Sequence, residues 1–173
     1  CHAPSKAERP NYGAKVQYAK EDNSPELGPK DVKFIQRTTG KFLYYGRTVD
    51  ITMNHALNDI ATTKDRQSKM EATRYFLDYA ATHPNAKVIY RASDMVLHVD
   101  SDAAYLVCSG ARSRMGGYFY LGNKDNNLHN GAILVLAKII KNVMSSTAEA
   151  ETGALFMNVQ EAIPIRRCLQ ELG

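Results

Sequence analysis

Cysteine is scarce in this chain and forms no motif. The three cysteines, Cys1, Cys108 and Cys168, lie far apart and show no Cys-x-x-Cys spacing. The five histidines show no ligand pattern either. The sequence therefore predicts neither a disulfide framework nor a zinc site, and a reducing compartment is the default.

Long apolar runs and leader segments are missing as well. No apolar run approaches the ~20 residues of a membrane span, and no signal peptide is visible. No internal repeat or low-complexity tract interrupts the chain. We therefore expect an intracellular protein that is not secreted and has no membrane partner. The first residue is Cys1 and not Met, which predicts a piece of a longer product.

The residues that are present suffice for one ordinary domain or two small ones. The chain has 173 residues, of which 44% are hydrophobic, and this fraction supports a folded core. Its formal net charge is +4. A mildly basic balance suits a nucleic-acid partner, although many unrelated domains share it.

The first part of the chain predicts an extended segment and then a helical unit. Residues 1–28 hold three of the six prolines and few large apolar side chains. Within them, Tyr12, Val16 and Tyr18 alternate and indicate one short edge strand. From residue 29 to 86 the apolar spacing predicts three short amphipathic helices, which together make a compact unit rather than an enzyme centre.

Local signals place the ends of these helices. Pro29 and Asp31 suit the first positions of one helix. Asp50 is expected to cap a second helix, whose apolar stripe is Met53, Ala56, Leu57 and Ile60. The third helix is expected to start at Asp65 or Ser68. It ends at His83-Pro84, because the residue before proline disfavours the helical conformation.

Residues 87–173 predict strands followed by a helix. Met95, Leu97 and Val99 lie on one face of an alternating strand, and the other face carries Val96, His98, Asp100 and Asp102. The next runs are Arg114–Leu121, which is rich in aromatic residues, and Ala132–Ala137, which is continuously apolar. The expected fold class is therefore α+β, with a helical unit followed by an antiparallel three-stranded sheet and a helix.

The final helix is expected to begin near Ser145, Ser146 and Thr147, which are good N-cap residues. An apolar stripe of Leu155, Val159 and Ala162, headed by Glu151, is expected to face the sheet, whereas Glu149 should face water. Asp102 and Glu151 would then meet. Pro164 predicts a break or kink, with 165–172 as a second segment.

Three segments resemble a known family. They are Ser101-Asp-Ala-Ala-Tyr105, Ala111-Arg-Ser-Arg-Met-Gly-Gly-Tyr-Phe119 and Val143-Met-Ser-Ser-Thr-Ala-Glu-Ala-Glu151. They resemble the RNase H domain of copia-type LTR-retrotransposon Pol polyproteins. Upstream, Lys41-Phe-Leu-Tyr-Tyr45 and Tyr79-Ala-Ala-Thr-His-Pro84 resemble the thumb or connection region that precedes this domain in the reverse transcriptase. The resemblance divides the chain at 1–28, 29–86 and 87–173.

The resemblance implies two-metal hydrolysis of RNA in RNA–DNA hybrids with Mg²⁺ or Mn²⁺. Asp102 and Glu151 match the family's acids on the first strand and first helix, as catalytic residues and metal ligands. The acids of the fourth strand and the later segment have no match, because the chain ends at Gly173 before them. The polymerase's Asp-Asp motif is absent too. We therefore expect this chain alone neither to polymerise nor to cleave.

The resemblance also implies partners and a location. The partners would be RNA–DNA hybrid and the remaining parts of the Pol polyprotein. The expected location is the cytoplasm, a virus-like particle or the nucleus. Four cations that flank the predicted strands are expected to meet phosphates: Arg112, Arg114, Lys138 and Lys141.

Plainer interpretations stay open for these residues. Asp102 also suits a strand-end turn, and Glu151 an ordinary acid at a helix N-terminus. Asp100 and Glu149 are expected to be solvated neighbours. His98, Tyr118 and Tyr120 suit packing on the sheet better than catalysis or base stacking. The alternative function is a non-catalytic nucleic-acid-binding domain or a structural remnant of a retroelement.

Overall fold

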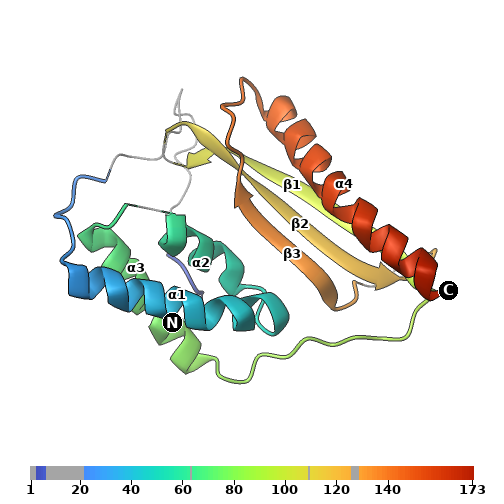
Figure 1. Cartoon of the computed structure of the whole chain (residues 1–173), viewed down its shortest axis with the longest axis horizontal. Coiled ribbons are helices and arrows are strands. Elements are labelled where there is room, and N and C mark those ends of the chain that lie inside the picture. Colours follow the sequence, from blue (N-terminus) through green and yellow to red (C-terminus); the bar gives the residue numbers. More distant parts are fainter. Residues whose placement is uncertain (1–2, 7–21, 63, 109, 126–128) are drawn as a thin grey trace. The chain divides into compact units, whose positions relative to one another are not determined.

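Helices come first along the chain and a sheet follows (Figure 1). The structure, a computed structural model, describes residues 3–6, 22–62, 64–108, 110–125 and 129–173. Within these residues, the chain up to Val88 forms one unit and the chain from Ile89 onward forms another. The predicted α+β class is confirmed. The strand expected at Tyr12, Val16 and Tyr18 lies outside the described residues.

The first unit holds three helices: α1 (Pro29–Thr48), α2 (Met53–Thr62) and α3 (Gln67–Thr82). Each was expected from its apolar spacing, and the stripe predicted for α2 is buried in full. Gly46 lets α1 approach α2 closely, since a Cβ added there would lie 2.9 Å from Cδ1 of Leu57. The buried side chains form one core: Ile35, Met53, Ala56, Leu57, Ile60, Met70, Phe76 and Tyr79.

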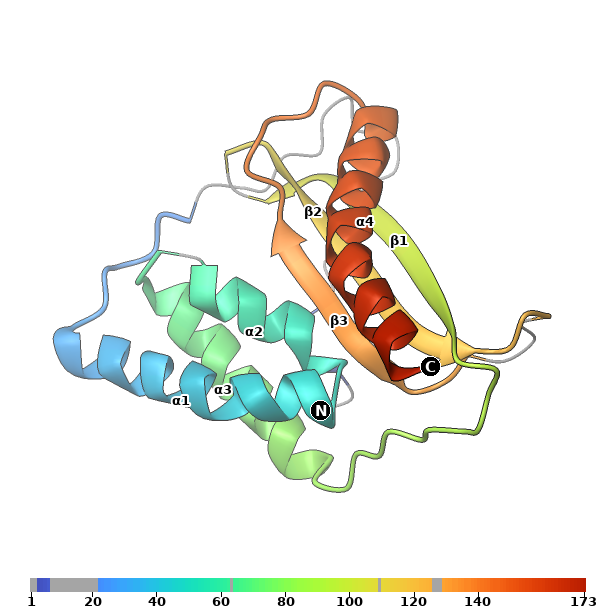
Figure 2. The same ribbon diagram turned by 45° about the vertical axis from the view of Figure 1, so that its right-hand side comes forward.

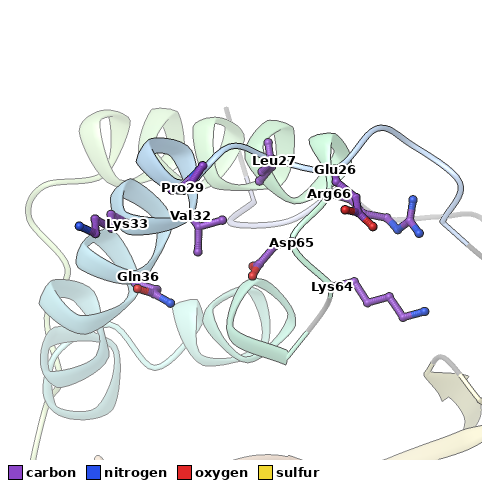
Figure 3. A pocket seen from close by; sticks show the side chains of 9 residues that line it. All are labelled: Glu26, Leu27, Pro29, Val32, Lys33, Gln36, Lys64, Asp65 and Arg66. Carbon is purple, nitrogen blue, oxygen red and sulfur yellow. The ribbon is translucent and has the colours of Figure 1, made fainter.

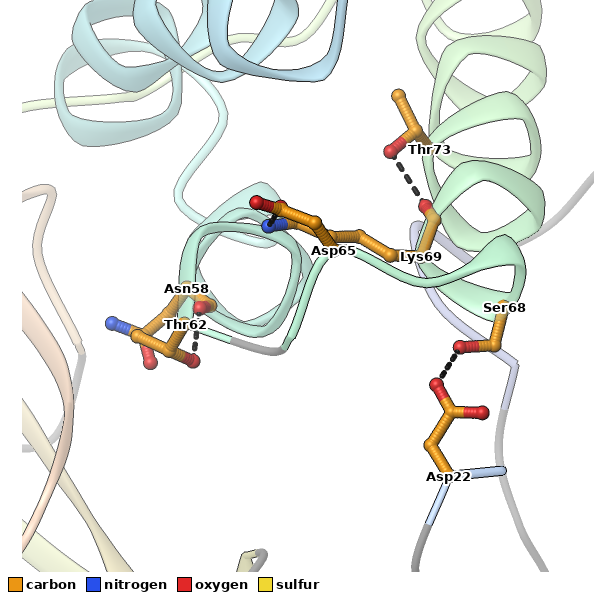
Figure 4. Close-up of polar contacts among 7 residues, drawn as sticks. All are labelled: Asp22, Asn58, Thr62, Asp65, Ser68, Lys69 and Thr73. Atoms are coloured by element: carbon orange, nitrogen blue, oxygen red, sulfur yellow. Dashed lines mark hydrogen bonds and ion pairs between the residues drawn. The ribbon is translucent and has the colours of Figure 1, made fainter. Parts of the chain in front are cut away.

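The start of α3 corrects a sequence-based expectation. The N-cap is Arg66, which offers no side-chain cap, rather than Asp65 or Ser68. The segment before α1 supplies the missing acceptors instead, because the Gln67 amide donates to the Pro25 carbonyl over 2.9 Å. In Figure 4 the Ser68 hydroxyl donates to the carboxylate of Asp22, and Asp65 pairs with Lys69 over 2.8 Å.

Asp50 joins the start of α2 to α3. Its Oδ1 accepts the Thr52 amide over 3.1 Å, and its Oδ2 accepts the Tyr79 hydroxyl over 3.3 Å. The side chain was expected to cap α2, and the turn that it stabilises directly precedes Met53. The Thr52 and Tyr79 donors satisfy the polar atoms of a side chain that is buried.

The second unit contains the sheet, with β1 (Val96–Cys108), β2 (Arg112–Gly122) and β3 (Ala132–Ile139). Both pairs are antiparallel and the order is β1-β2-β3. The register is continuous from Val96 to Ala104 and shifts before Cys108. Leu106 sits in this irregularity with a positive φ of 55°, and its amide donates to the Ser113 hydroxyl over 3.2 Å.

Helix α4 (Thr147–Leu172) crosses one face of the sheet (Figures 1 and 2). The prediction that Leu155 and Val159 face the sheet is wrong, since these side chains are 54% and 49% exposed. Ala150, Ala154 and Asn158 face the sheet instead, and all three are fully buried. Small side chains on this stripe let the helix lie close to the strands, which a leucine stripe would prevent.

The approach is closest at Gly117 of β2. A Cβ there would lie only 2.2 Å from Oδ1 of Asn158. Asn158 is held in place because its Nδ2 donates to the Ser101 hydroxyl and to the Gly116 carbonyl, over 2.8 Å each.

Of the break or kink expected at Pro164, the break is not present. Helix α4 continues as one helix to Leu172, with Pro164 inside it. Pro164 is exposed, so the carbonyl that loses its amide partner lies on a solvent-facing turn. None of the helices among the described residues is long and apolar enough to cross a membrane.

Candidate functional site

Asp102 lies in β1 on the face of the sheet that α4 leaves open. Its neighbour Ser101 contacts Asn158 of α4, and successive side chains of a strand point to opposite faces. Asp102 is exposed, as is Asp100 on the same face. The Oδ2 of Asp100 lies 3.4 Å from Nδ1 of His129. The open face of the sheet therefore carries both acids of the predicted strand.

Glu149 and Glu151 occupy different positions at the start of α4. The Glu149 amide donates to Oγ of the N-cap residue Ser146, over 3.1 Å. Its carboxylate accepts both the amide and the hydroxyl of Ser145, each over 2.6 Å. These bonds lower the pKa of Glu149. Glu149 is exposed, as expected, whereas Glu151 is half-buried at the margin of the sheet-facing stripe.

The acids do not fit a two-metal site as they are placed. Asp102 points to the open face, whereas α4, which carries Glu151, covers the opposite one. Across the described part of the chain, no three His, Cys, Asp or Glu side chains gather closely enough to hold a metal ion. A two-metal hydrolysis requires several convergent carboxylates. The catalytic and ligand roles of Asp102 and Glu151 therefore stay predictions.

Two of the four expected phosphate-binding cations are already engaged. Arg114 is only 7% exposed, and its Nη2 lies 3.6 Å from Sγ of Cys108. This burial leaves little of Arg114 accessible to a phosphate, so its nucleic-acid-binding role stays a prediction. Lys138 is exposed but forms an ion pair with Glu161 of α4 over 2.9 Å.

Arg112 and Lys141 are the better phosphate-binding candidates. Both are exposed, and they belong to the same end of the sheet. Arg114 pairs with Ile139, and the Ile140 amide donates to the Ser113 carbonyl over 2.9 Å. This register brings position 112 opposite position 141. The two cations therefore form a small basic edge where β2 begins and β3 has just ended.

An aromatic and imidazole cluster covers the other end of the open face. We call it the open-face cluster, and it consists of His98, Asp100, Tyr118, Tyr120 and His129. The rings of His98 and Tyr120 stack with centroids 5.1 Å apart, and His129 lies 5.3 Å from Tyr120. Burial raises the pKa of Tyr118. Tyr120 is buried and His98 half-buried, so the expected packing role of these side chains is confirmed.

Sequence reasoning missed Asn130, which fixes the chain beside this cluster. Its Nδ2 donates to the carbonyls of Arg91 and Leu121, over 2.8 Å each, and its Oδ1 accepts the Arg91 amide over 2.7 Å. The Tyr118 hydroxyl donates to the Asn130 carbonyl over 2.7 Å. The only local signal in the sequence was the Asn-Gly pair, which indicates a turn and not a side chain that joins two segments by hydrogen bonds.

A groove of about 820 Å³ lies in the helical unit (Figure 3). Its charged lining is of both signs: Glu26, Lys33, Lys64, Asp65 and Arg66. Arg66 is tied by Nη1 to the Ser24 carbonyl over 2.6 Å, and Asp65 is tied to Lys69. The groove therefore presents no field of one sign that would select a charged ligand.

A comparison with protein-family models, with curated proteins and with solved structures finds no match for this chain.

Proposed function

We propose that this chain is the reverse-transcriptase and RNase H region of a retroelement Pol polyprotein, and that it grips RNA–DNA hybrid without cleaving it. The observation that carries the proposal is the order of elements from residue 96 onward. Three antiparallel strands are followed by a helix across one face, which is what the family resemblance requires. The resemblance also supports an intracellular location and association with the rest of such a polyprotein.

The basic edge of Arg112 and Lys141 supports contact with phosphates. Both cations are exposed, and the formal net charge of +4 favours a polyanionic partner. Contacts to phosphate give affinity that falls with salt and carries no base preference. The geometry of Asp102 and Glu151 supports binding over hydrolysis, because the sheet separates the face of one from the face of the other.

Binding is tested by fluorescence anisotropy with a labelled RNA–DNA hybrid at several salt concentrations. Replacing both Arg112 and Lys141 by Ala should weaken binding and flatten the plot of log affinity against log salt, by about 0.9 for each phosphate that is no longer neutralised. Lys138→Ala is the matched control, since its ammonium is already paired with Glu161. An unchanged slope in the double variant would refute the basic edge as the hybrid-binding surface.

Hydrolysis is the second candidate function, favoured by the presence of Asp102 in the first strand and Glu151 in the first turns of the helix. Release of labelled RNA from a hybrid with Mg²⁺ or Mn²⁺ distinguishes the two functions. Single-stranded RNA serves as the control substrate. We expect no metal-dependent release from the chain and no difference in Asp102→Asn. Metal-dependent release that disappears in Asp102→Asn would establish hydrolysis instead.

A further inference from the structure

The outer side of α4 carries an apolar stripe that nothing among the described residues covers. Leu155, Phe156, Val159 and Ile163 are 54%, 62%, 49% and 46% exposed. At about 100° per residue, the four side chains fall within roughly 100° of the helix circumference, the width of a packing face. We call them the outer stripe. Apolar side chains that gather in this way mark an interaction surface more often than four scattered ones do.

The charges on α4 are distributed in a way that identifies the partner. Two further acids of α4 lie elsewhere, since Glu161 is paired with Lys138 and Glu171 lies in the last turn. The remaining charged residues are two acids before the outer stripe, Glu149 and Glu151, and two cations after it, Arg166 and Arg167. All four side chains are exposed or half-buried. Around the helix, Glu149 and Arg167 lie just beyond Phe156 on one side of the stripe. Glu151 lies beyond Leu155 on the other side, and Arg166 lies within the half of the stripe nearest to Leu155.

This arrangement is complementary to itself when a second helix lies antiparallel. A two-fold axis that crosses the stripe at right angles to the helix reverses the direction of the second helix. Each side of the stripe then faces the same side of the stripe in the second copy. Glu149 then faces Arg167 of the second copy, and Glu151 faces Arg166. The first pair has its midpoint at position 158 and the second between positions 158 and 159, which is where the outer stripe is centred. One axis therefore aligns the outer stripe and these four charged residues together.

We propose that the outer stripe of α4 is the interface of a two-fold symmetric dimer of this chain, with the two α4 helices antiparallel. The partner is a second copy, because the four charged residues complement themselves in this arrangement. The helices are antiparallel, because a parallel pairing would place acid against acid and cation against cation. The proposal is independent of the hybrid-binding function.

Sedimentation velocity on the full chain tests the dimer over a wide range of concentration. We expect the mass to rise from 19.3 kDa to twice that value. Phe156→Glu and, separately, Val159→Glu should remove the dimer at every concentration, while circular dichroism shows the helix content unchanged. Tyr44→Glu, on an aromatic residue of α1 that is 76% exposed, is the matched control and should dimerise normally. A chain that stays monomeric throughout, or a dimer that survives Phe156→Glu, would overturn the proposal.

Charge reversal tests the antiparallel arrangement. Arg166→Glu should raise the dissociation constant roughly tenfold, because symmetry repeats the new repulsion twice. Glu151→Arg should do the same. An equal mixture of these two variants should associate as well as the original chain, since each cation then faces an acid again. A mixture that associates no better than either variant alone would rule the arrangement out.

Discussion

At the scale of single residues, Gly117 has the least room for a side chain among the glycines in the described part of the sheet. A Cβ there would lie 2.2 Å from Oδ1 of Asn158 and 3.0 Å from the ring of Phe119. Asn158 is fully buried and held by two hydrogen bonds, so it has no free direction in which to retreat. Gly117→Ala should therefore lower the free energy of unfolding by about 1–3 kcal/mol, measured by denaturant unfolding.

Gly40 in α1 is the matched control for this substitution. A Cβ there meets no atom within 4 Å, and the position is exposed. Gly40→Ala should raise the free energy of unfolding by about 0.5–1 kcal/mol, because alanine loses less backbone freedom on folding than glycine. Equal effects at both positions would show that contact with Asn158 does not set the cost.

The carboxyl of Asp22 reports whether the segment before α1 is docked on α3. The Ser68 hydroxyl, together with the Ser24 amide and side chain, lowers its pKa from 3.8 to about 2. A lowered folded-state pKa gives stability that is present above 3.8 and is lost as pH falls towards 2. An NMR titration of the side-chain carboxyl should show the low midpoint. Ser68→Ala should move it upwards, and a midpoint that stays low would assign the shift to another group.

At the scale of elements, the N-terminus of α4 depends on one hydroxyl. Ser146 accepts the Glu149 amide, one of the donors that a helix leaves unpaired at its start. Ser146→Ala should cost about 0.5–2 kcal/mol in unfolding free energy, measured by thermal unfolding. Thr152→Ala, at an exposed position in the second turn of the helix, should cost nothing. A similar destabilisation in both variants would mean that the cap is not responsible.

At the scale of the whole molecule, metal ions should not stabilise the fold. A site that binds an ion only in the folded state adds about 2.7 kcal/mol when the ion is at a hundred times its dissociation constant. Because Asp102 and the helix with Glu151 are on different sides of the sheet, we expect no shift of the unfolding temperature with Mg²⁺. Calorimetry with and without the ion measures this, with Ca²⁺ as the control for general ionic effects. A rise specific to Mg²⁺ would show that the acids do converge.

Periodicity predicted the elements of this chain far better than it predicted their faces. The helices from Pro29 to Thr82 and the strand, strand, strand, helix order follow from apolar spacing and were expected. The buried face of α4 was not expected, because sequence spacing predicts an apolar stripe but does not predict how closely the helix approaches the sheet. Alanines and Asn158 occupy the contact, and the larger Leu155 and Val159 point outwards.

The candidate site was harder to predict, for a related reason. Strand alternation and helix spacing suggested that Asp102 and Glu151 meet, but only the contact of Asn158 with Ser101 shows that α4 covers the opposite face from Asp102. Likewise, Arg114 is buried whereas Arg112 is exposed, although both are basic and lie two positions apart in one strand. These outcomes depend on register and packing between distant segments, which composition and local spacing do not contain.

The contact of Gly117 with Asn158 also bears on how this sequence can change over generations. A side chain at 117 is acceptable only if 158 has first become smaller, and a smaller residue at 158 alone gives up the hydrogen bonds to Ser101 and Gly116. Each single step is therefore disfavoured, whereas the double change Gly117→Ala with Asn158→Ala relieves the overlap. Homologous sequences should accordingly either keep glycine and asparagine together or replace both, so the two columns of an alignment should vary as a pair.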